Sequence, residues 1–174
     1  MVSLPTLSNS SSHPWFALQV RARHEKSVAS CLHGKGYEEF LPLYRSRRQW
    51  SDRTKVVDLP LFAGYVFSRF DPLHQLPILT IPGVLSVVGF GNGPMPVDPS
   101  ELDVIHRITD AGTPAEPWPF LEEGQRVRVD YGPLAGVEGL LLKVRSQTRL
   151  VVSVTLLQRS VAVEVDRDAI SPIL

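Results

Sequence analysis

The pattern of hydrophobic and polar positions divides the chain into two parts with different periodicities. From about residue 15 to residue 112, short apolar runs typical of strands alternate with segments of helical periodicity. Beyond residue 120 the pattern consists of short strand-like segments at near-even spacing. The sequence therefore predicts an α+β protein of two domains, an α/β sandwich built on a four-stranded antiparallel sheet with helices and a small SH3-like β-barrel.

The first part is organised around an apolar run at residues 59–70. This run is rich in aromatic and β-branched residues and is bounded by Pro60 in front and by Asp71-Pro72 behind, which predicts a central strand. Alternation predicts one face made by Leu61, Ala63, Tyr65 and Phe67, and a second face nearer to Phe62, Val66 and Phe70. Because the strand is apolar on both faces, we expect helices over one face. The other face is either core or a docking surface for another protein.

The remaining elements of the first part follow from periodicity and from helix breakers. Further strands are predicted at residues 15–20, 37–44 and 84–90, with a basic extended hairpin or loop at residues 45–58. Helices are predicted at residues 24–33, from Asp71-Pro72 to a stop at Pro77, and from a capping box that starts at Asp98 to Gly112.

The second part begins after a proline-rich segment. Three prolines in residues 113–119 predict an extended, semi-stiff linker at residues 113–120. Short barrel strands are expected at residues 126–130, 139–145, 150–156 and 161–165. The predicted domains are therefore residues 14–112 and 121–174, preceded by a serine-rich disordered tail at residues 1–13.

Composition adds one informative asymmetry. The 174 residues contain 43% hydrophobic and 21% charged residues, as in an ordinary globular protein, and no apolar run approaches the ~20 residues of a membrane span. The single cysteine and the lack of signal-peptide features fit a cytoplasmic protein. Residues 13–70 hold ten Lys/Arg and five Asp/Glu, about +5, so the other residues hold eight and thirteen, about −5. A negatively charged partner should therefore meet the N-terminal half first.

Three segments, in this order, resemble the NusG family of bacterial transcription elongation and antitermination factors. They are Trp15–Val20 (WFALQV), Gly64–Phe67 (GYVF) and Gly132–Gly139 (GPLAGVEG), and one departure is Ala63, where the family often has proline. The resemblance implies an N-terminal NusG domain and a C-terminal KOW domain. Around Pro114–Phe120, the chain is similar to the specialised RfaH-like and UpxY-like antiterminators of polysaccharide operons rather than to the housekeeping factor.

The resemblance also implies a polymerase-binding surface. The family presents aromatic residues at this strand in an open depression that grips the clamp helices of RNA polymerase. The predicted polymerase-binding residues are Tyr65, Phe67, Gln19 and Val87. Gln19 is expected on the rim, and Trp15, Phe16 and Val87 are expected as supporting core. The alternative is that the aromatic side chains belong to the core of the sheet.

A basic set of residues is the candidate nucleic-acid interface. Its members are Arg21, Arg23, His24, Lys26, Arg45, Arg47, Arg48 and Trp50. An aromatic residue among arginines suits phosphate contact together with base stacking on a single strand. The resemblance implies the non-template DNA strand as the partner. A charge run is also compatible with a simple solvated face.

The KOW motif residues Gly132, Gly136 and Gly139 are predicted to serve tight turns. The resemblance implies that this domain binds ribosomal protein S10 or the termination factor Rho, and the residues do not choose between them. A KOW-containing ribosomal or RNA-binding protein is an alternative function. Ribosomal proteins are usually strongly basic, however, whereas this chain has a net charge of zero.

Enzymatic function finds no support in the sequence. The five histidines show no metal-ligand spacing, and one cysteine gives no thiolate cluster. The glycine-rich segment at residues 89–93 fails both the dinucleotide and the P-loop patterns. We therefore expect a non-enzymatic monomer that has no cofactor, no metal and no membrane contact.

Overall fold

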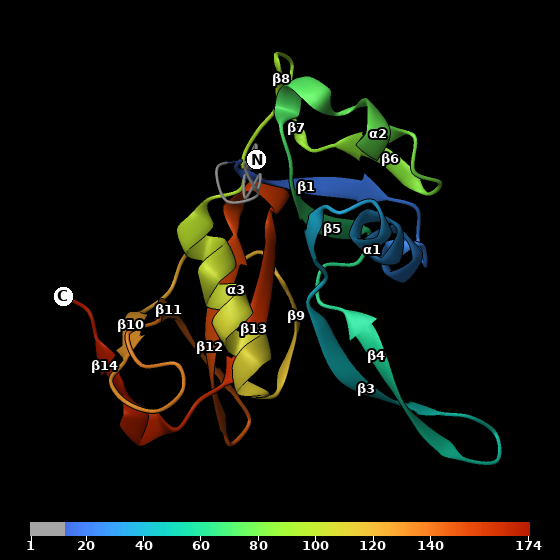
Figure 1. Ribbon diagram of the computed structural model, residues 1–174. Coiled ribbons are helices and arrows are strands. Elements are labelled where there is room, and N and C mark those ends of the chain that lie inside the picture. The colour runs from blue at the N-terminus through green and yellow to red at the C-terminus, as the bar shows by residue number, and fades with distance from the viewer. Residues whose placement is uncertain (1–12) are drawn as a thin grey trace, which may run out of the picture. The chain divides into compact units, whose positions relative to one another are not determined.

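The computed structural model, shown in Figure 1, describes residues 13–174. The predicted tail lies outside the described residues except for His13. Contacts divide the chain into two units: residues up to Leu41 with Gly64–Pro96, and Pro42–Ala63 with Val97–Leu174. Across the described part of the chain, no helix has the length and apolar character needed to cross a membrane.

The first unit contains the expected four-stranded antiparallel sheet, in the order β2-β5-β1-β6. Its strands are β1 (Trp15–Val20), β2 (Glu38–Phe40), β5 (Tyr65–Arg69) and β6 (Val84–Val87). The helical elements are α1 (Glu25–Gly34), a 3₁₀ turn (Pro72–His74) and α2 (Leu76–Leu79), and a small hairpin follows, β7 (Gly89–Phe90) with β8 (Gly93–Pro94). Pro77 lies in the first turn of α2, where its missing N–H costs nothing, and so it does not end the preceding helix as predicted.

One face of this sheet forms the core with α1 and α2. The buried side chains are Phe16, Leu18, Val20, Val28, Ala29, Leu32, Val66, Phe70, Ile78 and Ile81. The rings of Phe16 and Phe70 lie 4.9 Å apart between centroids and join neighbouring strands. The expectation that helices cover the Val66 and Phe70 face is therefore confirmed.

The central strand is shorter than predicted. Strand β4 ends at Pro60 and β5 begins only at Tyr65, because Gly64 adopts φ +86°, a conformation that interrupts strand pairing and favours glycine. Two hydrogen bonds fix this turn: Val20 N–H donates to the Gly64 carbonyl at 2.8 Å, and Gly64 N–H donates to Glu25 Oε1 at 2.9 Å. Glu25, at the start of α1, is buried, so its carboxylate joins the helix to the first residue before β5.

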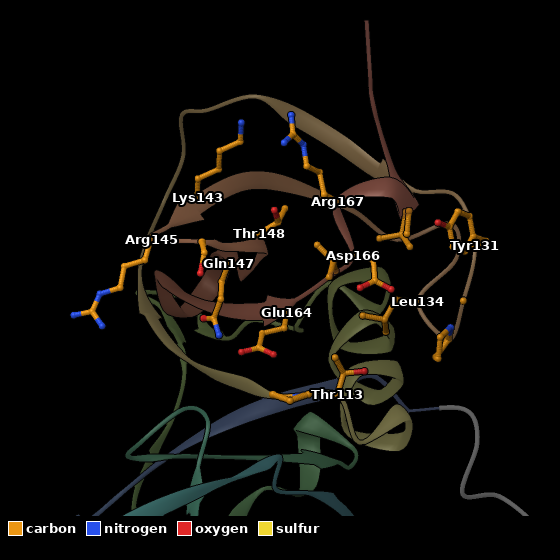
Figure 2. Close-up of a pocket in the computed structure, with 17 residues that line it drawn as sticks. Thr113, Tyr131, Leu134, Lys143, Arg145, Gln147, Thr148, Glu164, Asp166 and Arg167 are labelled. Atoms are coloured by element: carbon orange, nitrogen blue, oxygen red, sulfur yellow. The ribbon is translucent and has the colours of Figure 1, made fainter.

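The second unit contains a six-stranded antiparallel sheet in the order β14-β10-β11-β12-β13-β9. The sheet curls around its core, as the view into one end shows in Figure 2. Its strands are β9 (Ala115–Pro119), β10 (Arg126–Val129), β11 (Glu138–Val144), β12 (Gln147–Val154), β13 (Arg159–Glu164) and β14 (Ile170–Pro172). Short 3₁₀ turns occur at Thr155–Leu157 and Arg167–Ala169. The same unit holds the hairpin of β3 (Leu43–Gln49) and β4 (Thr54–Pro60) and the helix α3 (Pro99–Ala111).

Part of the predicted linker is a paired strand. Strand β9 pairs with β13 in a register that sets Pro117 opposite Val161 and Glu116 opposite Ala162, and Glu116 also forms an ion pair with Arg149. The prediction of an unpaired linker at residues 113–120 is wrong for residues 115–119, because they pair with β13. Strand β9 lies at the edge of the sheet. An edge strand tolerates proline at positions where the missing N–H would face away from its neighbour.

Helix α3 begins and ends as the sequence predicts. Asp98 is its N-cap and accepts a hydrogen bond from Ser100 N–H at 2.9 Å, Pro99 follows at the first turn, and Gly112 closes it with φ +64°. The helix belongs to the unit of the curled sheet, which differs from the predicted boundary at residue 112. Arg107 donates to the carbonyls of Pro133 and Ala135, and Glu101 accepts from Thr155 N–H at 3.0 Å.

Replacing Asp98 tests the cap. Hydrogen bonds from the Ser100 side chain and backbone hold the pKa of Asp98 below its usual 3.8. The stabilisation is therefore complete above that value and is lost as the pH falls through the lower pKa of the folded state. We expect Asp98→Ala to lower the free energy of unfolding by about 1 kcal/mol at pH 7 in urea titrations. A difference from wild type that stays constant at pH values well below 3.8 would contradict this account.

Replacing Glu25 tests the bond to Gly64. In Glu25→Ala the Gly64 N–H loses its acceptor in a buried site, so we expect a loss of about 1–3 kcal/mol in urea unfolding. Glu25→Gln keeps an oxygen acceptor of the same shape and should lose clearly less. Equal losses in the two variants would show that the hydrogen bond is not the source of the effect.

Candidate functional site

The first candidate surface is the sheet face opposite α1 and α2, which we call the aromatic face. The register of β1 and β5 places Gln19 beside Tyr65, Ala17 beside Phe67 and Trp15 beside Arg69. Strand β2 adds Phe40 beside Phe67, with the two rings stacked at 6.2 Å between centroids. The Arg69 guanidinium lies 5.1 Å from the Trp15 ring centroid and donates to Glu38 at 3.1 Å. The face therefore has an outer row of Gln19 with Tyr65 and a second outer row of Trp15 with Arg69. Between them, Ala17 and Phe67 are fully buried.

The predicted polymerase-binding residues divide between the two faces. Tyr65 and Gln19 are neighbours on the aromatic face, Tyr65 half-buried and Gln19 exposed, and Ser86 Oγ lies 3.4 Å from Gln19 Oε1. Phe67 is on the same face but fully buried. Val87 pairs with Leu18 and packs against the helix-covered core, so it does not share the aromatic face. The reason is the register of β6, which places Ser86, and not Val87, beside Gln19.

Sequence reasoning missed three members of the aromatic face: Phe40, Trp15 and Arg69. Trp15 was expected as supporting core, and Phe40 belongs to a strand of only three residues. Phe40 could have been found from the pairing of β2 with β5, but nothing in its local sequence specifies that register. For Trp15 a signal exists, since the alternation in Trp15–Val20 places it on the side away from Phe16 and Leu18.

The basic candidates form two separate groups. Arg21, Arg23 and His24 lie in the turn between β1 and α1, with Lys26 in the first turn of the helix, and all four are exposed. Arg23 adopts φ +67°, a conformation uncommon for a residue with a Cβ. The other group, Arg45, Arg47, Arg48 and Trp50, lies on the β3–β4 hairpin in the second unit. Each group is therefore a separate candidate site.

The hairpin confirms the expected extended element and separates its arginines by face and by position. Arg45 is directly opposite Asp58, so its charge has a cross-strand counterpart near the root of the hairpin. Arg48 is directly opposite Lys55, a pair of like charges. Arg47, Arg48, Arg53 and Lys55 are all exposed, and none of them makes an ion pair with another of residues 13–174.

The hairpin tip therefore carries unbalanced positive charge beside an exposed aromatic ring. Residues 47–56 include four basic and one acidic residue, a net charge of +3. Trp50 is 61% exposed at the start of the turn, where its N–H donates to the Arg53 carbonyl at 2.8 Å. Like charges directly opposite on two strands destabilise a hairpin, and Arg48 and Lys55 form such a pair with no anion of the described chain paired to either. A phosphate group would relieve this repulsion, since each phosphate carries a negative charge.

The KOW-motif glycines play two different roles. Gly132 and Gly136 lie in the β10–β11 loop with φ +92° and +87°, as expected for tight turns, and Gly136 N–H donates to the Val129 carbonyl at 2.7 Å. Gly139 is not in a turn. It lies in β11, where a Cβ would come within 2.5 Å of the Val151 carbonyl oxygen. It is glycine because the backbones approach closely there.

Together these features define a two-unit α+β protein whose candidate sites are surfaces for macromolecules. The family model described as "Transcription termination factor nusG" matches residues 13–106, more than half of the chain. The NusG transcription termination/antitermination protein of Escherichia coli strain K12 is 30% identical over 135 residues, which cover 74% of this chain and 71% of that protein. The Campylobacter jejuni protein of the same name is 27% identical over 169 residues, covering 89% and 94% of the two chains. The chain therefore belongs to the NusG family of transcription termination and antitermination factors.

A solved structure of Thermotoga maritima NusG supports the fold. It superposes with a TM-score of 0.59 and 20% sequence identity, covering 95% of this chain and 100% of that chain. At this identity the likeness concerns the fold alone. It agrees with the expected pairing of a sheet-and-helix domain with a C-terminal β-rich domain.

Replacing charges at the hairpin tip tests the nucleic-acid interface. We expect Arg47→Ala/Arg48→Ala/Lys55→Ala to weaken binding to a polymerase elongation complex and to flatten the dependence of log K on log salt. The slope should fall by about 0.7 for each phosphate of a single strand that the variant no longer touches. Binding to polymerase without nucleic acid should change little. Because like charges are removed, the free energy of unfolding should stay equal or rise by about 0.2–1 kcal/mol.

The single changes Arg45→Ala and Arg48→Ala form a matched pair, since Arg45 has Asp58 opposite it whereas Arg48 has Lys55. A smaller effect from Arg45→Ala than from Arg48→Ala is expected. Equal losses of affinity for polymerase with and without nucleic acid would place the arginines on a protein surface.

Proposed function

We propose that the chain is a non-enzymatic transcription elongation and antitermination factor that binds RNA polymerase through the aromatic face and suppresses pausing or termination. Membership of the NusG family supports the class of function. The single observation that carries the binding mode is that Gln19, exposed, and Tyr65, half-buried, lie side by side on the sheet face opposite α1 and α2. An aromatic anchor with a polar rim suits a groove-type contact with a helix, such as the clamp helices.

In this proposal Phe67 supports the surface and does not touch the partner directly. Phe67 is fully buried and stacks on Phe40, so it fixes the strand that carries Tyr65. Tyr65 is therefore the residue through which the aromatic face acts.

The other surfaces have secondary roles in the same proposal. The basic hairpin tip would contact the non-template DNA strand, where its four exposed cations and Trp50 match a single-stranded polyanion. The β10–β11 loop would recruit a second protein, with ribosomal protein S10 or Rho as the candidates. Gly132 and Pro133 of this loop are exposed, and Arg107 of α3 fixes its shape by bonding two of its carbonyls.

Binding to purified core RNA polymerase tests the proposed function. We expect Tyr65→Ala/Gln19→Ala to weaken affinity by about 30-fold or more, the effect of losing an interface hot spot of about 2 kcal/mol. Phe67→Ala is unsuitable because the cavity left by a buried phenylalanine costs about 3–5 kcal/mol of stability. Circular dichroism and urea unfolding would verify that the variant is folded.

Phe90→Ala is the matched control, because Phe90 is 68% exposed in the same unit and lies outside the aromatic face. Its affinity for polymerase should equal that of wild type. The proposal fails if folded Tyr65→Ala/Gln19→Ala binds polymerase as tightly as Phe90→Ala does.

A further inference from the structure

One end of the curled sheet in the second unit encloses an open cavity of about 760 Å³ (Figure 2). Its walls come from the β10–β11 loop, the β11–β12 turn and the segment between β13 and β14. Val129, Leu134 and Ala169 supply buried apolar lining. The contacts proposed above for polymerase and for DNA use other residues, whereas the β10–β11 loop of this cavity is the loop proposed above to recruit a second protein.

Three cations lie at the rim of the cavity. Lys143, Arg145 and Arg167 are exposed, and none of them forms an ion pair within the described chain. In Figure 2, Lys143 and Arg167 extend in the same direction from one edge of the cavity, whereas Arg145 extends to the side. Arg145 adopts φ +55° in the turn between β11 and β12, a position that glycine or asparagine would occupy with less strain. Such strain in a residue with a Cβ concentrates at binding sites.

The cavity also contains hydrogen-bond acceptors and an aromatic ring. Glu164 and Asp166 line it from the end of β13 and the segment that follows, together with Gln147 and Thr148 of β12. Carboxylates only accept hydrogen bonds, so they select ligand groups that carry N–H donors. Tyr131 is 56% exposed on the opposite side of the cavity, where its ring is available for stacking.

This combination of charges disfavours ligands that carry charge of one sign only. A small inorganic anion would meet the two carboxylates, and a basic peptide would meet the three cations. A nucleotide satisfies both groups because it joins a negatively charged phosphate to a planar base with amino donors. Basic side chains with an aromatic platform are the usual features of single-strand binding surfaces.

We propose that this cavity binds one nucleotide of a single-stranded nucleic acid. The base enters the cavity, stacks on Tyr131 and donates from its exocyclic amine to Glu164. The adjoining phosphates lie on Lys143, Arg145 and Arg167. This site is additional to the hairpin, and its existence does not depend on polymerase binding.

Fluorescence anisotropy with labelled cytidine oligonucleotides of about eight residues tests the proposal. The background is full-length protein carrying Arg47→Ala/Arg48→Ala/Lys55→Ala, which removes the hairpin tip as a second site. Binding should persist in this background, and adding Lys143→Ala/Arg145→Ala should weaken it at least tenfold. The slope of log K against log salt should fall by about 1.4, two phosphates at about 0.7 each. Arg159→Ala, at the far end of β13, is the matched control and should change affinity less than twofold.

A second comparison separates base recognition from general charge attraction. Cytosine offers an amino donor where uracil has a carbonyl acceptor, so the cytidine oligonucleotide should bind more tightly than its uridine counterpart. Glu164→Gln should reduce this preference, although removing a negative charge would strengthen a purely electrostatic contact. Tyr131→Ala should weaken both oligonucleotides roughly tenfold.

Ribose and deoxyribose cytidine oligonucleotides, measured side by side, identify RNA or DNA as the source of the nucleotide. Binding of either one at the cavity supports the proposal. Three results would overturn it: no binding in the hairpin-variant background, equal effects of Lys143→Ala/Arg145→Ala and Arg159→Ala, or a base preference that Glu164→Gln leaves unchanged. The polymerase assay with Tyr65→Ala/Gln19→Ala is independent of all three.

Discussion

The hydrogen bond from Gly64 N–H to the buried Glu25 carboxylate positions the sheet of the first unit. Gly64 also accepts from Val20 N–H, so one residue connects the end of β1, the start of α1 and the start of β5. A register shift by one residue would exchange the two faces of β5 and bury Tyr65 against α1. The bond therefore fixes Gly64 directly before β5, and the pairing of β5 with β1 sets which side chains reach the aromatic face. Glycine suits this position, directly before the tyrosine proposed to contact polymerase, because its φ is +86°, a conformation that residues with a Cβ rarely adopt.

Local signals in the sequence predicted the elements that depend on local chemistry. The Asp98 cap and the closing Gly112 predicted the bounds of α3 closely, because caps and left-handed turns are satisfied within a few residues. The Glu101 side chain, which would complete the predicted capping box, accepts from Thr155 instead. The length of the central strand and the pairing of β9 were predicted incorrectly. Both depend on distant partners: Glu25 for the turn at Gly64, and β13 for a proline-rich segment that has little intrinsic tendency to pair. The residues of the aromatic face show the same difference between local and distant determinants. Alternation along the sequence placed Tyr65 correctly, whereas placing Phe40 requires the register of β2 with β5.

The hairpin illustrates a conflict between stability and the nucleic-acid binding proposed for it. Placing Arg48 opposite Lys55 lowers the stability of the isolated hairpin, and Arg45 opposite Asp58 shows that the same two strands also contain a balanced pair. Local rules are broken most often where function requires it. The unbalanced pair lies toward the exposed tip with Trp50, and the balanced pair lies near the root. Net positive charge therefore increases along the hairpin from its root toward its exposed tip.

The division into units bears on the role expected for the proline-rich segment between the predicted domains. A flexible proline-rich tether would let a C-terminal barrel act at a distance by raising local concentration alone. Here the chain passes between the units after Leu41, Ala63 and Pro96, and residues 115–119 are paired within the sheet of the second unit. The segments 42–63 and 97–106 lie within the part that matches the NusG family model, yet they belong to the unit of the C-terminal sheet. The basic hairpin, α3 and the KOW-motif loop are consequently parts of one unit, in which Arg107 and Glu101 bond α3 to the sheet and its loop. The β10–β11 loop and α3 are connected directly, because Arg107 bonds two carbonyls of that loop.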